Sequence, residues 1–563
     1  MWKIVLGALS ASGVVGLIVL LNPLTLFPAL SVGVSTVQAS TTVPRVAVAR
    51  ADISETDILE ATAPAPTTPV PTTIVHLFEW TWADIASECE TYLGPNGYRA
   101  VQISPPQEHI VLPDYGYPWW QRYQPVSYRL ESRSGTRAEL QDMISRCREA
   151  GVAIYADAVI NHMAGFESGV GSAGTRFTKY DYPGLYKPED FNDCHQNVTD
   201  YGNAENVTQC ELVGLADLNT SSPKVQATLV NYMSELVEMG VAGFRIDAAK
   251  HIRNEELGEI LTQLRDRHPE TELYIYQEVI DPGTEAIRKQ DYYDSGNVLD
   301  FKYGRFIGLA FLGLEGQTLA NLQTLGEGWG LAPSAQSVVF TDNHDKQRGH
   351  GGGGDYLTYK NGDLYALANV FMLAFPYGKP QVMSSFAFDD SEQGPPTYDD
   401  GTTQPVYQGG EANCFADWVC EHRWPAIAGM VGFRNATEPV AEVTDWWSNN
   451  ANQIAFGRGD LGFVAINREA QPLTHRFQTQ LPPGRYCNVV QGGLSADGTA
   501  CANNANVVLV NRAGQLTATL PQMSALAIHV EAKLPDRLFG IWSGFLSAVE
   551  GFDGKAHQQN KEG

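Results

Sequence analysis

The feature that most constrains how this chain can fold is the stretch from Val241 to His251, an apolar run that ends in charged side chains. In an extended strand alternate side chains share a face, so Arg245 and Asp247 are predicted to be neighbours. The guanidinium favours an ionised carboxylate, which predicts a lowered pKa for Asp247 and suits a nucleophile. A buried ion pair that only closes the end of a strand is the structural alternative.

Three more apolar runs have the same design. Residues 152–162 end in Asn161 and His162, residues 274–281 carry Glu278 near their end, and residues 338–345 end in Asp342, His344 and Asp345. Apolar runs of this length are typical of buried strands, and helical segments lie between them. Polar groups at the C-terminal ends of several strands indicate an active site on a (β/α)8 TIM barrel, an α/β fold.

Length and charge narrow the class of protein further. A chain of 563 residues exceeds what one hydrophobic core usually holds, so more than one domain is expected. The net charge of −26 argues against a nucleic-acid partner, because phosphates require a basic surface. It fits a soluble protein that acts on a neutral or diffusible substrate.

The N-terminus is expected to direct export. An apolar region with a single cation at Lys3 leads to Val37-Gln-Ala39, a small-residue pattern typical of signal cleavage. Residues 1–39 are therefore interpreted as a signal peptide or, if they stay uncleaved, as a membrane anchor. Residues 40–72 are rich in Pro and Thr and are expected to form an extended linker.

Four of the segments, with several further motifs, resemble a known family. Asp157–His162, Gly243–His251, Gln277–Asp281 and Phe340–Asp345 resemble, in order and spacing, the signature regions of the α-amylase family of glycoside hydrolases. The resemblance is closest to animal-type members and covers residues 72–532. Further matching motifs are His76-Leu-Phe-Glu-Trp80, Tyr98–Pro106, Trp119–Tyr128, Arg348–Gly354 and Val382–Ser385.

The resemblance implies an order of domains. The catalytic barrel would occupy residues 73–162 and 218–443, interrupted by an irregular domain B at residues 163–217. Short alternating strands in residues 444–532 predict a C-terminal antiparallel β-sandwich, domain C. The resemblance assigns no role to the tail at residues 533–563.

The resemblance also implies the reaction, which is endo-acting hydrolysis of internal α-1,4 bonds of starch or glycogen with retention. Asp247 would act as the nucleophile, Glu278 as the acid/base and Asp345 as a third carboxylate that grips sugar hydroxyls. Glu278 follows the apolar residues 274–277, and such surroundings favour the protonated acid that a proton donor requires.

Other residues match substrate contacts of the family. Trp119, Trp120 and Tyr123 would offer flat faces to sugar rings, and His162 and His344 would donate hydrogen bonds at the cleaved sugar. The further contacts implied are Tyr201, Arg245, Lys250, His251 and His350. Considered alone, each aromatic would be assigned to the core and each histidine to a structural role. The enzyme is expected to be a secreted monomer whose partners are starch, glycogen and maltooligosaccharides.

Calcium is the cofactor that the resemblance implies. Calcium prefers several hard oxygen ligands, and the matching groups are the side chains of Asn161 and Asp217 with the carbonyls of Thr208 and His251. Because His251 lies just after the nucleophile, the ion would connect domain B to the active site. A loop cap is the alternative role for Asn161 or Asp217 alone.

Chloride dependence is predicted to be weak or absent. Many animal-type members hold an activating chloride through an arginine, an asparagine and a third basic residue. Arg245 and Asn343 match the first two, but Gln381 stands at the third position. Losing that cation weakens the attraction for an anion, although Lys379 lies two residues away.

Eight cysteines in an exported chain indicate disulfides rather than metal ligation or free thiols, and the pairing stays open from the sequence alone. The resemblance selects Cys89 with Cys147, Cys194 with Cys210, Cys414 with Cys420, and Cys487 with Cys501. Glu131 occupies a position where vertebrate members have a further cysteine.

Three alternatives stay open. A transglycosylase or an exo-acting maltooligosaccharide-forming enzyme of the same family would keep the same carboxylates. A non-catalytic starch-binding protein would be expected to lose one of them, and all three are present. A glycan-capture protein held at the surface would need the N-terminal anchor and binding without turnover.

Overall fold

The computed structural model describes residues 71–351, 356–502 and 505–535. The predicted signal peptide or anchor, nearly all of the predicted linker and the tail from residue 536 lie outside the described residues. Within the described part of the chain, no helix combines the length and the apolar character needed to cross a membrane.

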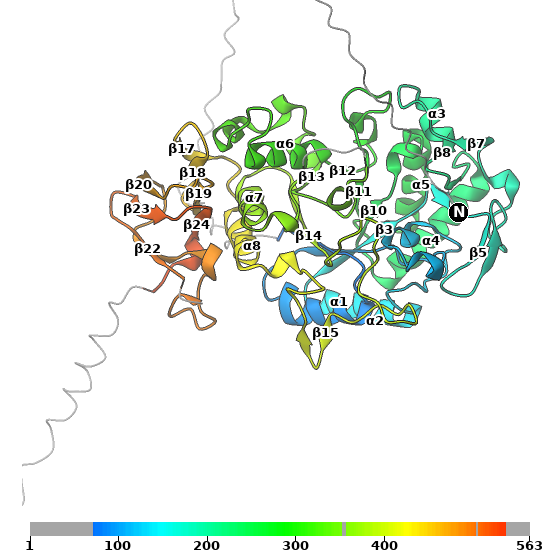
Figure 1. Ribbon diagram of the computed structural model, residues 1–563, viewed down its shortest axis with the longest axis horizontal. Coiled ribbons are helices and arrows are strands. Elements are labelled where there is room, and N and C mark those ends of the chain that lie inside the picture. The colour runs from blue at the N-terminus through cyan, green and yellow to red at the C-terminus, as the bar shows by residue number, and fades with distance from the viewer. Residues whose placement is uncertain (1–70, 352–355, 503–504, 536–563) are drawn as a thin grey trace, which may run out of the picture. The chain divides into compact units, whose positions relative to one another are not determined.

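Eight parallel strands form a closed barrel, as the polar strand ends predict (Figure 1). The order around the barrel is β1-β14-β13-β12-β11-β10-β3-β2. The strands are β1 (Ile74–Leu77), β2 (Ala100–Ile103), β3 (Ala153–Ala158), β10 (Gly243–Ile246), β11 (Tyr274–Gln277), β12 (Asn297–Leu299), β13 (Ser337–Phe340) and β14 (Lys379–Ser384). Since all run in the same direction, their C-terminal ends meet at one face of the barrel.

The inside of the barrel is a packed core of large side chains, which include Tyr155, Tyr276 and Phe340. Gly243 at the start of β10 makes room for them. A Cβ atom at this position would lie 2.2 Å from the carbonyl oxygen of Tyr274 and 2.9 Å from the ring of Tyr155. The outward-facing Phe244 of the same strand packs instead into the core beneath the helices.

Helices cover the outside of the barrel. They are α1 (Trp82–Glu88), α2 (Arg137–Glu149), α4 (Pro223–Met239), α5 (Asn254–Arg267), α6 (Phe301–Leu312), α7 (Asp363–Ala374) and α8 (Pro425–Thr437). Local signals set their ends: Thr136 and Glu139 form a capping box at α2, and Gly240 with φ of 106° ends α4. The connection from β11 to β12 holds a 3-10 helix, η6 (Lys289–Tyr292), instead of an α-helix.

A long excursion leaves the barrel between β3 and α4. Its elements are β4 (His162–Met163), β5 (Ser168–Val170), β6 (Arg176–Thr178), β7 (Cys194–Asn197), α3 (Ala204–Gln209), β8 (Cys210–Glu211) and β9 (Ala216–Asp217). Strands β4 and β9 pair antiparallel and place His162 opposite Asp217. The two ends of the excursion are thereby joined beside the C-terminal end of β3.

The C-terminal part is antiparallel. Strands β17, β18, β19 and β24 form a four-stranded sheet, while β20 pairs with β23 and β21 with β22. The short β15–β16 pair belongs to the barrel part, where Tyr407 contacts α1. These strands are β15 (Tyr407–Gln408), β16 (Glu411–Ala412), β17 (Thr444–Ser448), β18 (Gln453–Arg458), β19 (Gly462–Asn467), β20 (Leu473–Gln478), β21 (Gly484–Cys487), β22 (Val507–Val510), β23 (Gln515–Leu520) and β24 (Ser524–His529). Phe463 and Phe477 share a core cluster between the sheets, and the opposite face of β18 and β19 packs with residues of α7 and α8.

Four disulfides join the pairs that the resemblance implies. They are Cys89–Cys147, Cys194–Cys210, Cys414–Cys420 and Cys487–Cys501. The second of these closes the part of the excursion that contains α3. Together they use every cysteine of the sequence.

Candidate active site

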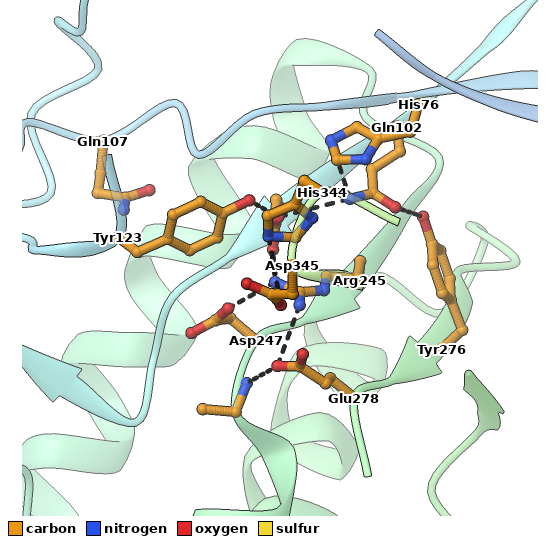
Figure 2. A network of polar contacts seen from close by, with 12 residues as sticks. His76, Gln102, Gln107, Tyr123, Arg245, Asp247, Tyr276, Glu278, His344 and Asp345 are labelled. Carbon is orange, nitrogen blue, oxygen red and sulfur yellow. Dashed lines mark hydrogen bonds and ion pairs between the residues drawn. The ribbon is translucent and has the colours of Figure 1, made fainter. Parts of the chain in front are cut away.

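Arg245 on β10 is the centre of a buried group of carboxylates (Figure 2). Its Nη1 lies 2.7 Å from Oδ1 of Asp157 and 2.5 Å from Oδ1 of Asp247. Its Nη2 lies 3.0 Å from Oε2 of Glu278. The three carboxylates come from the neighbouring strands β3, β10 and β11 or from the residues that directly follow them. One guanidinium thus faces three acidic side chains at the C-terminal end of the barrel.

The protonation of Asp247 differs from the prediction. Burial raises the pKa of Asp247 well above its ordinary value, and Arg245 only partly offsets this. Burial likewise raises the pKa of Asp157 to about 6. The lowered pKa predicted for Asp247 is therefore wrong, because the side chain is almost fully desolvated and must share its cation with two other carboxylates.

Glu278 contacts the residue that follows Asp247. Its Oε2 accepts a 2.9 Å hydrogen bond from the backbone N–H of Ala248, which has a left-handed φ of 47°. The turn at Ala248 therefore directs an N–H group from the end of β10 towards the end of β11. Oε2 faces this donor and the guanidinium, so its surroundings are more polar than the apolar run before Glu278 predicts.

Two histidines beside the carboxylates are held neutral. Burial lowers the pKa of His344 well below its ordinary value and that of His162 to about 4. His344 Nε2 lies 3.6 Å from Oδ2 of Asp345. His162 Nε2 lies 3.0 Å from the carbonyl oxygen of Tyr123. At neutral pH each ring has one N–H, so each can donate a hydrogen bond without carrying charge.

The aromatic residues of η3 (Trp119–Tyr123) line the same region. The ring of Tyr123 stacks on His344 with centroids 5.1 Å apart, and its hydroxyl donates a 3.0 Å hydrogen bond to Asp157. Trp119 meets His344 edge-on at 5.6 Å. The structure therefore brings Trp119 and Tyr123 to the carboxylates, as predicted, with both rings mostly buried.

Comparisons with known proteins agree with this arrangement. Residues 91–289 match the alpha amylase catalytic domain, and residues 446–531 match the alpha amylase C-terminal all-beta domain. An α-amylase of Thermomonospora curvata is 49% identical over 82% of this chain and 73% of that protein. An α-amylase of Tribolium castaneum is 46% identical over 82% of this chain and 94% of that protein. The chain belongs to the α-amylase family.

A solved α-amylase supports the same conclusion. The structure of a mutant α-amylase I from Eisenia fetida, a complex with maltohexaose, has a TM-score of 0.78 and 41% sequence identity. The alignment covers 82% of this chain and 98% of that one. The family resemblance and the fold class predicted from the sequence are confirmed, and the α-amylase catalytic domain makes the chain a glycoside hydrolase.

The remaining predicted substrate contacts of this α-amylase family member form two groups. Lys250 pairs with Glu285, its Nζ lies 4.9 Å from the ring centroid of Tyr201, and His251 meets the same ring at 6.1 Å. In the other group, His350 lies 5.7 Å from Trp119, measured between ring centroids. The Nε2 of His350 lies 3.2 Å from Oε1 of Glu392, and Oε2 of the same carboxylate accepts a hydrogen bond from the indole N–H of Trp120.

The predicted calcium ligands lie in two contacting pairs of segments where the excursion meets the barrel. Asp217 lies in β9 opposite His162, the residue after Asn161. Nδ1 of His251 lies 3.0 Å from the carbonyl oxygen of Val207, next to Thr208. Asp217 is buried and accepts a 2.7 Å hydrogen bond from Asn192. Among the described residues, the groups that act on Asp217 are amides and other carboxylates, and no cluster of three His, Cys, Asp or Glu side chains suited to a metal is found.

The predicted chloride position is filled by a neutral network. Gln381 donates a 2.7 Å hydrogen bond to Oε1 of Gln102, which also accepts from Tyr276 at 2.9 Å. Asn343 accepts from the backbone N–H of Lys346. Lys379 lies at the beginning of β14, where its Nζ sits 4.1 Å from the ring centroid of Tyr274.

Three residues with a clear part in this site were not assigned a role from the sequence. Asp157 and Gln102 connect Arg245 to the barrel interior. Arg348 donates a 3.0 Å hydrogen bond to the carbonyl oxygen of His344 and lies among four aromatic rings. Asp157 could have been found, because it lies near the end of the apolar run that leads to Asn161. The partners of Gln102 and the aromatic rings around Arg348 are distant in sequence.

Proposed function

We propose that this chain is an endo-acting α-amylase that hydrolyses internal α-1,4-glucosidic bonds of starch, glycogen and maltooligosaccharides with retention. The observation that carries the proposal is that Asp247 and Glu278, at the ends of adjacent strands, both contact Arg245. Retaining glycosidases need two carboxyl groups roughly 5 to 5.5 Å apart on opposite sides of the bond they cleave. Side chains from neighbouring strand ends that share one guanidinium fit this requirement.

In the first step, the carboxylate of Asp247 attacks the anomeric carbon while the glycosidic C–O bond breaks. Glu278 gives its proton to the departing oxygen, so that the leaving chain is released as an alcohol. Arg245 stabilises the charged form of Asp247, since its guanidinium is the nearest cation to that carboxylate. In the second step, Glu278 takes a proton from water, which displaces Asp247 and restores both groups.

The surrounding side chains hold the sugar. Neutral His344 donates a hydrogen bond to a sugar hydroxyl, and Asp345 beside it accepts one. His162 gives its N–H to the carbonyl oxygen of Tyr123 in the free enzyme, so it would donate to the sugar by exchanging that hydrogen bond. Such contacts raise the rate when they strengthen as the ring distorts towards the transition state. Further sugar contacts are assigned to Trp119, Trp120, Tyr123, Tyr201, Arg245, Lys250, His251 and His350.

Calcium fits the position that the family resemblance assigns to it. Asp217 is a buried carboxylate whose described partners include no cation, and Asn161 and the carbonyls of Thr208 and His251 add hard oxygen donors. When bound, the ion would give the carboxylate of Asp217 a positively charged partner. It would also join the excursion to the segment after Asp247. Chloride fits poorly, because Arg245 already faces three carboxylates and Gln381 is neutral.

The domain division and the site of action are also part of this proposal. A barrel at residues 73–162 and 218–443, domain B at 163–217 and domain C at 444–532 fit the closed barrel and the antiparallel sheets. Four disulfides fit an oxidising compartment outside the cell. We propose a secreted monomer, which the N-terminal segment would hold at a membrane only if it stays uncleaved.

The test is reducing-end release from soluble starch by the full chain with calcium, together with the chain-length profile of the products. An endo-acting enzyme shortens the polymer rapidly to mixed maltooligosaccharides, and Glu278→Gln should lower the rate by several orders of magnitude. Release of a single short product would indicate exo-action, and longer products built from short donors would indicate a transglycosylase. Starch binding without turnover would refute the proposal that this chain hydrolyses starch.

A further inference from the structure

Three aromatic rings form a cluster beyond the predicted sugar contacts. Tyr115 lies 5.8 Å from Phe166 and 6.4 Å from Trp120, and Phe166 lies nearly parallel to Trp120 at 6.4 Å, all between ring centroids. Tyr115 belongs to η2 (Pro113–Tyr115), Trp120 to η3, and Phe166 to the start of the excursion. The cluster therefore joins the loop after β2 to the segment after β3.

This aromatic cluster is open to solvent. Tyr115 is 61% exposed, which is unusual for a ring that has two aromatic neighbours, and Trp120 and Phe166 are only half-buried. Exposed aromatic groups that gather in one place commonly mark a ligand surface, since a stable core would have buried them. The rings carry no charge, so they suit a ligand with flat apolar faces.

The cluster is continuous with the active site. Trp119, the residue before Trp120, meets His344 at 5.6 Å, and His344 lies beside Asp345. Glu392 supplies polar groups along the same path, because it accepts a 2.6 Å hydrogen bond from the indole of Trp120 and lies 3.2 Å from His350. Flat apolar faces next to a carboxylate acceptor are what a sugar ring with equatorial hydroxyls requires.

We propose that Tyr115 and Phe166, with Trp120, form an additional distal subsite that binds one end of a long α-glucan chain. The inference rests on the proposed function and adds a preference for substrate length. A chain that reaches from Asp247 past Trp119 and Trp120 meets Tyr115 next, whereas a short oligosaccharide held at the carboxylates does not extend that far. Contact with the rings then contributes binding only for long substrates.

The test compares kcat/KM for maltotetraose and maltoheptaose in the wild type, Tyr115→Ala and Phe166→Ala. Loss of one stacking surface should lower kcat/KM for maltoheptaose by roughly 3- to 10-fold. It should leave kcat/KM for maltotetraose unchanged. Tyr115→Phe should retain the wild-type ratio of kcat/KM between maltoheptaose and maltotetraose, because the ring face is kept. Phe415→Ala, which removes a ring that is 66% exposed and makes no ring contact with the cluster, is the matched control.

Equal effects on both substrates, or no effect on either, would overturn the subsite. A wild type that hydrolyses neither substrate would instead refute the proposed function, and the subsite is then judged by binding alone. For this purpose, calorimetric titration of maltoheptaose into Glu278→Gln and into its double variant with Tyr115→Ala measures the same contact without turnover. A weaker affinity in the double variant supports the subsite, and an unchanged affinity contradicts it.

Discussion

Gln381 donates a 2.7 Å hydrogen bond to Gln102, and Gln102 in turn donates to Asp157, which pairs with Arg245. A cation at position 381 would add positive charge next to Gln102 in this chain of contacts. With an amide there, position 381 adds no charge, and Arg245 already contacts three carboxylates. The environment is therefore unfavourable for a small anion.

Chloride should accordingly have little effect on this enzyme. On protein freed of salt, adding chloride is expected to change kcat by less than about 2-fold, since the guanidinium of Arg245 is already paired with three carboxylates. Gln381→Arg should introduce a stimulation, with Gln381→Leu as the control that removes the amide without adding charge. A several-fold stimulation of the wild type would refute this prediction.

Asp157 should act as a positioning residue for Arg245. In Asp157→Asn, the 2.7 Å ion pair is lost and the guanidinium is free to move towards Asp247 and Glu278. A small displacement of groups around the reacting atoms can cost up to roughly 100-fold in rate, so kcat should fall while KM changes little. Steady-state kinetics on maltoheptaose decide the matter. An unchanged kcat, or a change confined to KM, would show that the pair is only structural.

Calcium should contribute to thermal stability through Asp217. A chelator is expected to lower the Tm of the wild type, and added calcium should restore it, because an ion bound only to the folded state stabilises that state. Asp217→Asn removes the carboxylate charge and should make Tm insensitive to the chelator and to added calcium. The measurement is differential scanning calorimetry, with Asp181→Asn, an exposed carboxylate in the same excursion, as the control. A calcium response that survives Asp217→Asn would place the ion elsewhere.

Ionisation of Glu421 should lower the free energy of unfolding of the wild type as pH rises from about 4.5 to about 6. Burial raises its pKa to about 6 from an ordinary value of 4.5, so the folded state holds a proton that the unfolded state releases in this window. The free energy of unfolding then falls with rising pH by about 2 kcal/mol in total. His162 and His251 have pKa values lowered to about 4, so their ionisation makes the free energy of unfolding rise with pH over the same range. The difference between wild type and Glu421→Gln therefore isolates the carboxyl group.

Urea unfolding of the two proteins between pH 4 and 7 measures this difference. Relative to wild type, the stability of Glu421→Gln should increase across the window. The change should be nearly complete at pH 7, where the folded wild type has also lost the proton. A difference that does not depend on pH would show that Glu421 keeps an ordinary pKa in the fold.

Much of the barrel could be predicted because its strands are short apolar runs with marked ends. The residues after β3, β10, β11 and β13 were identified from that pattern, and the structure brings Asp247, Glu278 and their neighbours together. A strand pattern predicts which side chains lie on the same face. It does not predict how many carboxylates contact the same guanidinium.

The pKa of Asp247 and the environment of Glu278 illustrate that limit. Both depend on tertiary burial and on Asp157, which belongs to another strand, so the sequence pattern alone led to the wrong direction for Asp247. The contacts of Tyr115 with Phe166 and of Gln381 with Gln102 join segments that are distant along the chain. No local pattern encodes such pairs, and only the fold defines them.

The most direct test of the central claim is the anomeric configuration of the first product. Proton NMR during the first turnovers of maltoheptaose hydrolysis should show the α anomer appearing before mutarotation forms the β anomer. Double displacement through Asp247 and Glu278 requires this order, since two inversions give net retention. Initial release of the β anomer would contradict the account, because it would mean that water attacks directly and that Asp247 forms no covalent bond to the sugar.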